Sequence, residues 1–163
     1  MLGYIRRTAP AVARALLRRD GALVSRIERR VGPFELDTNL HMNQAVYAQV
    51  MELGRVDWFV RSGVFARWRE QGISAVVASQ RLIYRRELRL GTRYTIDTRA
   101  LQMNGRLLEM HSNLLVGERV HARCELELIM LQGGSVLDAD AATRACEGLM
   151  CEPLAIADWV VTG

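Results

Sequence analysis

The 163-residue sequence contains no lysine, so all 22 of its basic residues are arginine. We attribute this bias to the base composition of the genome, and a single arginine is therefore a weak sign of a functional site. Proline is also scarce, with three residues, which excludes a collagen-like or low-complexity chain. No apolar run approaches the ~18–20 residues that a membrane-spanning helix needs, so such a helix is excluded as well.

Cysteine and histidine are few and scattered. The cysteines are odd in number and form no CxxC pair, so we expect free thiols in a reducing, cytoplasmic compartment. The histidines lie far apart on expected strands and loops, where no cluster of zinc ligands forms. We therefore predict neither a disulfide nor a metal site. The residues concerned are Cys124, Cys146, Cys151, His41, His111 and His121.

Half of the residues are hydrophobic and 25% are charged, a composition typical of a packed globular protein. A chain of this length buries roughly two thirds of its unfolded surface on folding. It therefore needs neither a disulfide nor a metal ion for stability. We expect a single domain over residues 21–163, preceded by a basic helical extension over residues 1–20.

The extension carries arginine pairs on both sides of an apolar stretch that is too short for a secretory signal. The pattern predicts a basic amphipathic helix over Ala11–Arg19. We favour the interpretation that this helix packs on its own domain or frays in solvent. The alternative is that Met1–Arg19 makes peripheral contact with an anionic membrane surface.

The formal net charge is +4 and the isoelectric point is near 9.4. An excess of this sign suits an anionic ligand, an acidic membrane surface or nucleic acid. The sequence contains no helix-turn-helix, zinc-finger or aromatic RNA-binding signature, so we do not expect nucleic acid as a partner.

One long amphipathic helix is predicted over Gln44–Ser62. Its apolar residues recur with the i, i+3, i+4 spacing of a buried helix face, and Asn43 is suited to cap its first turn. Gly54 costs roughly 1 kcal/mol relative to alanine in mid-helix, which close contact with a sheet would explain. The buried stripe consists of Tyr47, Val50, Met51, Gly54 and Trp58.

Most of the chain from Ile73 to Gln132 alternates apolar and polar residues, which predicts antiparallel strands with one buried face. Asn104–Gly105 is a strong hairpin signal, and further helices are expected over Val64–Gln71 and Asp138–Leu149. Together these elements predict an α+β fold in which an antiparallel sheet wraps around one long central helix. The expected strands include Ser25–Val31, Ser74–Tyr84, Arg93–Leu101, Leu108–Leu114 and Val120–Met130.

A spaced set of polar residues lies between the first strand and the long helix. It reads DTNLHMNQAVY from Asp37 to Tyr47, and the helix continues with Glu52 and Arg55. This pattern resembles that of the hotdog-fold thioesterases of the 4-hydroxybenzoyl-CoA type, whose signature is Asp-x-x-Gly-His-x-Asn-Asn-x-x-Tyr followed by Glu-x-x-Arg. The resemblance covers residues 26–132 and is closest to the branch related to thioesterase superfamily member six.

The resemblance implies hydrolysis of an acyl-CoA or acyl-carrier thioester. Asp37 would be the carboxylate that attacks the carbonyl carbon or activates a water molecule. His41 would support it catalytically or, in the interpretation we favour, through a hydrogen bond that orients the loop. Glu52 is a reserve candidate because some members of the family place a catalytic glutamate on this helix; otherwise it pairs with Arg55.

Substrate binding would involve the start of the helix. Backbone N–H groups near Val46 and Tyr47, at the positive end of the helix dipole, would polarise the thioester carbonyl. Asn43 is either a structural cap or a binding group, and the hydroxyl of Tyr47 would line the cavity. Three arginines after a strand suit the phosphates of coenzyme A, with a solvated surface as the alternative. They are Arg85, Arg86 and Arg89.

Two residues depart from the family pattern: Leu40 replaces the glycine and Gln44 the second asparagine. We expect Leu40 to disfavour a positive φ and to narrow the entrance to the site. Because these departures affect the catalytic loop, the alternative function is a non-catalytic acyl- or CoA-binding protein.

No cofactor is expected beyond the coenzyme A of the substrate. The family joins unpaired sheet edges between subunits, which implies a homodimer or a dimer of dimers.

Overall fold

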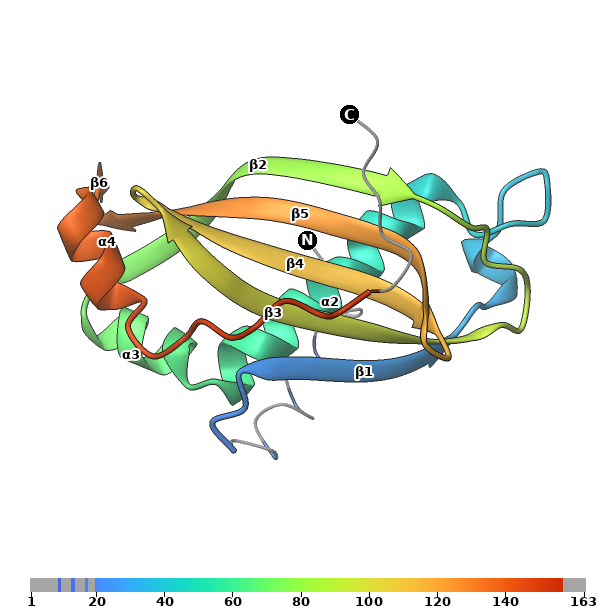
Figure 1. Ribbon diagram of the computed structural model, residues 1–163, viewed down its shortest axis with the longest axis horizontal. Coiled ribbons are helices and arrows are strands. Elements are labelled where there is room, and N and C mark those ends of the chain that lie inside the picture. Colours follow the sequence, from blue (N-terminus) through green and yellow to red (C-terminus); the bar gives the residue numbers. More distant parts are fainter. Residues whose placement is uncertain (1–8, 10–12, 14–16, 18–19, 157–163) are drawn as a thin grey trace.

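The structure is a computed structural model that describes residues 9, 13, 17 and 20–156. Figure 1 shows a curved sheet with one long helix, α2 (Gln44–Arg61), along one of its faces. The predicted α+β arrangement, a sheet wrapped around a central helix, is therefore confirmed. The helix predicted over Ala11–Arg19 lies almost entirely outside the described residues and stays a prediction.

The sheet contains six antiparallel strands in the order β1-β3-β4-β5-β2, with the short β6 paired to β5. β1 and β2 therefore form its two long edges. Each expected strand is present, and the ends differ from the predicted ones by a few residues. The strands are β1 (Val24–Arg30), β2 (Ile73–Tyr84), β3 (Arg93–Asn104), β4 (Leu107–Val116), β5 (Arg119–Gln132) and β6 (Ser135–Val136).

The core lies between the sheet and α2. Residues predicted to face the helix from β3, β4 and β5 are buried, as the alternating pattern requires. Met51 and Trp58 contribute the two largest fully buried side chains from α2. Asn43 caps the helix as predicted, because its Oδ1 accepts a hydrogen bond from the N–H of Ala45 at 2.9 Å. The shorter helices are η1 (Pro33–Glu35), α3 (Val64–Glu70) and α4 (Ala139–Ala145).

Gly54 lies where α2 approaches β3 most closely. A Cβ atom at this position would lie 2.3 Å from Oγ1 of Thr98 and 2.8 Å from Cγ2 of Ile96. Both distances are far shorter than a carbon atom tolerates, so the helix can rest on the strand only without a side chain here. The close contact predicted from the mid-helix glycine is confirmed.

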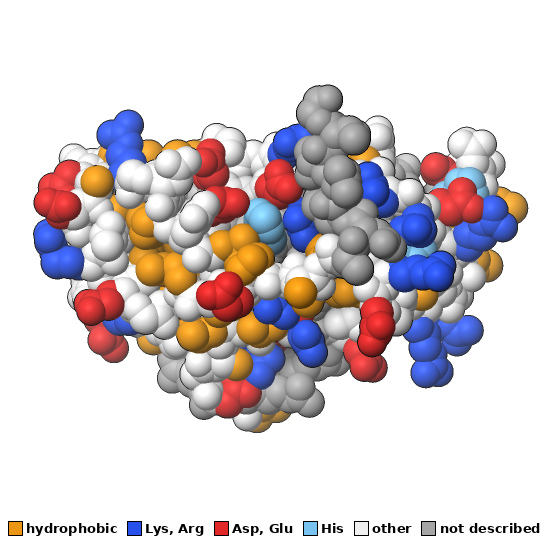
Figure 2. Space-filling view, viewed as in Figure 1, with side chains coloured by type: hydrophobic (Ala, Val, Ile, Leu, Met, Phe, Trp, Pro, Cys, Tyr) orange, Lys and Arg blue, Asp and Glu red, His pale blue; other side chains and the backbone are white. Residues whose placement is uncertain are grey.

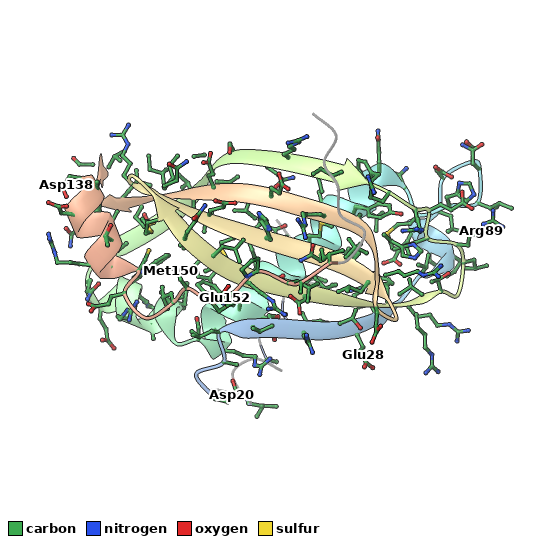
Figure 3. The ribbon with its side chains drawn as sticks, in the orientation of Figure 1. Asp20, Glu28, Arg89, Asp138, Met150 and Glu152 are labelled. Atoms are coloured by element: carbon green, nitrogen blue, oxygen red, sulfur yellow. The ribbon has the colours of Figure 1, made fainter. Side chains whose placement is uncertain are left out.

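The outer face of the sheet carries a buried carboxylate. Asp97 is fully buried, and its oxygens accept hydrogen bonds from Nε of Arg26 at 2.9 Å and Nε of Arg99 at 2.7 Å. Arg99 also donates to the backbone carbonyl of Glu152 at 3.0 Å. The segment after α4 thus crosses the face of the sheet opposite α2, as Figures 1 and 3 show.

The C-terminal helix is shorter than predicted. We expected a helix over Asp138–Leu149, but α4 ends at Ala145. Asp138 is its N-cap, with Oδ1 accepting from the N–H of Ala141 at 2.8 Å. Gly148 adopts a φ of 75°, which turns the chain so that Leu149 becomes buried in the core. Packing of the segment after the turn therefore overrides the local helical pattern.

Leu40 adopts a backbone conformation that we predicted it would disfavour. Its φ is 62°, and it is the one described non-glycine residue with a positive φ. The turn is closed by Asp37, whose Oδ1 accepts from the N–H groups of Asn39 at 2.9 Å and His41 at 3.2 Å. These bonds hold the loop in the shape that glycine would adopt. Leu40 therefore adopts the positive φ that we expected leucine to disfavour, at an energetic cost that these hydrogen bonds offset.

We predict that Gly54→Ala destabilises the protein although alanine favours helices. Overpacking costs about 1–3 kcal/mol, against a helix-propensity gain of roughly 1 kcal/mol. The free energy of unfolding, measured by urea denaturation, should fall. In a Thr98→Ala background, which lacks the nearest clashing atom, Gly54→Ala should lower the free energy of unfolding by less than it does in the parent protein. A Gly54→Ala variant as stable as the parent would contradict the close contact.

We predict that Leu40→Gly stabilises the fold. A non-glycine residue in the left-handed region costs roughly 1–2 kcal/mol, whereas glycine loses about 0.5–1 kcal/mol through chain entropy. The side chain of Leu40 is 70% exposed, so little burial is lost. The free energy of unfolding should therefore rise by up to about 1 kcal/mol. Leu40→Val, with a β-branched side chain, should lower it, and the opposite order would disprove the argument.

Candidate functional site

An open cavity of about 580 Å³ lies between the loop before α2, the first turn of α2 and the end of β2. It brings together six of the predicted site residues: Asp37, His41, Asn43, Tyr47, Arg85 and Arg86. Four further residues complete its lining: Met42, Gln44, Tyr84 and Glu87. The cavity lies at the end of the molecule where Figure 3 labels Arg89.

Asp37 combines a structural and an available oxygen atom. Its Oδ1 accepts the two backbone hydrogen bonds that close the loop. Its Oδ2 has no hydrogen-bond partner among residues 20–156, and the half-buried side chain lines the cavity. The carboxylate can therefore shape the loop and still offer one oxygen atom to a bound molecule.

His41 is oriented by Glu87, which is not among the site residues predicted from the sequence. Its Nε2 lies 2.9 Å from Oε2 of Glu87. The other oxygen of that carboxylate accepts from Nε of Arg89 at 2.6 Å. Because the backbone of His41 also bridges to Arg89, the loop and the segment after β2 are held together at both backbone and side chain. The one signal for Glu87 was a lone carboxylate among three arginines.

Two tyrosines form one wall of the cavity. The ring of Tyr84, at the end of β2, meets that of Tyr47 edge to face, with centroids 5.2 Å apart. Burial raises the pKa of Tyr47, an effect opposed by a hydrogen bond with the backbone of Leu88. Burial also raises the pKa of Tyr84, so both hydroxyls stay protonated at neutral pH. The position of Tyr84 in a strand follows from the sequence, but no sequence pattern indicates a role for it at the site.

The start of α2 faces the cavity through Gln44 and Tyr47, whereas Val46 does not line it. The N–H of Val46 donates to the backbone carbonyl of Asn43 at 2.8 Å. That amide, which we expected to polarise a carbonyl, is thus engaged in the helix cap. Asn43 caps the helix as predicted and also lines the cavity, and its role in binding stays a prediction.

The three predicted arginines divide into two groups. Arg85 and Arg86 line the cavity. Their backbone N–H groups both donate to the backbone carbonyl of His121, at 2.8 and 3.0 Å. These bonds turn the chain out of the sheet toward the site. Arg89 instead pairs with Glu87 and does not line the cavity. Burial lowers the pKa of His121, whose Nδ1 lies 3.1 Å from the carbonyl oxygen of Glu87.

Two other residues singled out in the sequence lie away from the cavity. Glu52, the reserve candidate, is 3.8 Å from Nη2 of Arg55 and is not among the lining residues. Leu40 is also absent from the lining, so it does not narrow the entrance as we expected. Its side chain extends into solvent instead.

The described part of the chain shows no group of three or more His, Cys, Asp or Glu residues that could hold a metal ion. None of its helices combines the length and apolarity that crossing a membrane requires.

The lining residues of the cavity supply carboxylate, imidazole, phenol and guanidinium groups. This arrangement is suited to acid–base chemistry beside an anionic ligand.

Three known proteins illustrate what the chain is similar to. The protein THEM6 of Xenopus laevis is 39% identical over 69 residues, 42% of this chain, and the match spans only 33% of that relative. The probable thioesterase YbaW of Escherichia coli superposes with a TM-score of 0.71, at 21% identity, covering 78% of this chain and 99% of that one. A Thermus thermophilus thioesterase complexed with coenzyme A and zinc gives a TM-score of 0.60, at 26% identity, covering 79% and 98%.

A family model also matches most of the chain. The model of the thioesterase-like superfamily covers residues 31–145, which is more than half of the chain. This range includes the loop that carries Asp37, the whole of α2 and every strand of the sheet except β1. The structural similarity to YbaW confirms the hotdog fold expected from the sequence. The chain therefore belongs to the thioesterase-like superfamily.

Proposed function

We propose that the protein hydrolyses an acyl thioester of the coenzyme A or acyl-carrier type, with Asp37 as the reactive carboxylate. The observation that carries the proposal is the unbonded Oδ2 of Asp37 in a cavity at the start of α2. The positive end of a helix dipole stabilises the negative charge that develops on a thioester oxygen. Family membership supports the same chemistry.

Asp37 acts in one of two ways. It either attacks the thioester carbon to form a mixed anhydride, or takes a proton from a water molecule that attacks instead. In the first route the carbon–sulfur bond breaks, the thiolate takes a proton from solvent, and a water molecule then hydrolyses the anhydride to the carboxylic acid and free Asp37. In the second route the proton that Asp37 takes from the water molecule passes to the thiolate as the carbon–sulfur bond breaks. His41 lies in the same cavity, oriented by Glu87, and we assign it the supporting role of positioning the loop and the water molecule.

Arg85 and Arg86 are the residues we assign to the phosphates of coenzyme A. Both side chains are exposed at the cavity, and guanidinium groups match phosphate geometry. The Thermus thermophilus neighbour is complexed with coenzyme A, which is consistent with such a substrate. Arg89 lies further out and pairs with Glu87, so its contribution would be indirect. No cofactor other than the coenzyme A of the substrate enters this proposal.

We further propose that two protomers associate through β2. This strand forms one edge of the sheet, and within residues 20–156 its outer side has no partner strand. Val76 and Val77 are 49% and 45% exposed there. An unpaired apolar edge is an aggregation hazard unless it is covered. A second copy pairing edge to edge would cover it, and the cavity at the end of β2 would then lie near the partner.

A non-catalytic acyl- or CoA-binding protein is the second candidate. The observation in its favour is Gln44, which lines the cavity where the family has asparagine. Saturable binding of acyl-CoA without release of thiol would establish this alternative. Peripheral membrane contact through Met1–Arg19 is compatible with either function and stays a proposal, because most of that segment lies outside the described residues.

We predict that Asp37→Asn lowers kcat/KM for acyl-CoA hydrolysis at least about a hundredfold, as expected for loss of a catalytic base or nucleophile. Asparagine keeps an Oδ1 acceptor for the loop bonds, so the fold should be retained. Thiol release should be measured across acyl-chain lengths, with Thr38→Ala, a neighbour outside the cavity lining, as the matched control. Unchanged turnover in Asp37→Asn would remove Asp37 from the mechanism.

We predict that Val77→Arg shifts the protein from dimer to monomer, because charge repulsion and desolvation oppose edge-to-edge pairing. Mass measured by light scattering during gel filtration tests this. Val136→Arg is the control, since Val136 is similarly exposed, at 44%, but lies on β6. A parent protein that is monomeric, or a Val77→Arg variant that stays dimeric, would refute the β2 interface.

A further inference from the structure

Three large apolar side chains protrude into solvent at the end of the molecule that holds the cavity. Phe34 is 99% exposed, Leu40 is 70% exposed and Leu90 is 57% exposed. None of the three lines the cavity. We call these residues the apolar tip. Core packing does not explain them, because they face water, and neither the cavity nor the β2 edge uses them.

The three residues belong to segments that are hydrogen-bonded to one another. Arg89, next to Leu90, bridges to His41, next to Leu40. On the other side of Leu90, the N–H of Gly91 donates to the carbonyl of Val31 at 3.0 Å, three residues before Phe34. The segment with Leu90 therefore runs between the loop of Leu40 and the turn of Phe34, so the apolar tip is one continuous region of the fold.

The apolar tip is flanked by arginines that lack carboxylate partners among residues 20–156. Arg30 and Arg93 are directly opposite each other on β1 and β3, a like-charge pairing that destabilises a sheet unless an anion compensates it. Arg30 donates to the carbonyl oxygen of Gly91, at 2.7 Å. Arg86 and Arg93 form no ion pair with any residue of that range.

Figure 2 shows arginine side chains and apolar side chains together at this end of the molecule, which is the end where Figure 3 labels Arg89. The partner of such a surface must combine negative charge with an apolar interior. It must also accept side chains that protrude separately from three loops rather than line a groove. A bilayer containing anionic lipids has these properties.

We propose that the apolar tip and its flanking arginines dock the protein on an anionic lipid bilayer. Phe34, Leu40 and Leu90 insert at the boundary between headgroups and acyl chains, and Arg30 and Arg93 contact the lipid phosphates. The docking itself does not depend on catalysis. If the site also hydrolyses long-chain acyl thioesters, which rests on the proposed function above, docking places the cavity at the surface where such amphiphiles accumulate.

The test is flotation of the full chain with vesicles of phosphatidylcholine alone and of phosphatidylcholine mixed with phosphatidylserine. The parent should float with the anionic vesicles and remain behind with the neutral ones. The triple variant Phe34→Ser, Leu40→Ser, Leu90→Ser should lower the partition coefficient by at least about tenfold, as expected for losing three inserted apolar side chains. The variant Arg30→Gln, Arg93→Gln should lower it several-fold and flatten its salt dependence.

The matched control is Phe65→Ser, Val136→Ser, which removes two exposed apolar side chains from α3 and β6. It should float like the parent. A second control, Arg14→Gln, Arg18→Gln, Arg19→Gln, removes charge from the basic extension and should reduce flotation less than the apolar-tip variant does. Circular dichroism and thermal melting would test whether each variant is folded.

Several outcomes would overturn the proposal. These are a parent that does not bind anionic vesicles at low salt, an apolar-tip variant that floats like the parent, and an equal loss in the Phe65/Val136 control. Loss of all binding in the basic-extension control would assign the contact to that segment instead. Binding of an acidic carrier protein through the apolar tip, without vesicle binding, would show that the anionic partner is a protein.

Discussion

The contact between Gly54 and β3 sets how closely α2 can approach the sheet. Because no side chain separates α2 from Thr98 and Ile96, the helix lies deep against the sheet and the sheet curves around it. The depth of the helix fixes where its first turn emerges, and that turn forms the base of the cavity. The site is therefore a consequence of backbone packing, and its geometry depends on a residue that does not line it.

A second constraint connects the loop before α2 to the end of β2. Asp37 closes the loop through Oδ1, and the backbone N–H of Met42 donates to the carbonyl of Leu88 at 2.7 Å. Glu87 adds a side-chain bond to His41. Hence the carboxylate assigned to catalysis is held by a network that spans two segments far apart in sequence. The same network explains how Leu40 can occupy a conformation suited to glycine, since several bonds share the cost of one strained residue.

Most of the fold can be predicted from the sequence because the signals involved are local. Alternation along the strands and the 3.6-residue period of α2 report burial directly, and a glycine in the middle of that helix is by itself a sign of close contact. Errors arise where distant contacts decide the outcome. The helix expected to reach Leu149 stops at Ala145 because the following segment packs on the sheet. Glu87 and Tyr84 enter the cavity only because β2 ends beside α2, which no local pattern reveals.

For the arginines, too, contacts between distant parts of the chain carry more information than the sequence composition does. A chain without lysine spreads guanidinium groups everywhere, so their number carries little information. Their partners carry more: Arg61 contacts Asp20 and Asp57, and such pairs stabilise the fold locally. Arg30 and Arg93 face each other instead, at the end where apolar side chains protrude. Since like charges repel across a sheet, their juxtaposition lowers stability in isolation and favours an anionic partner at this surface.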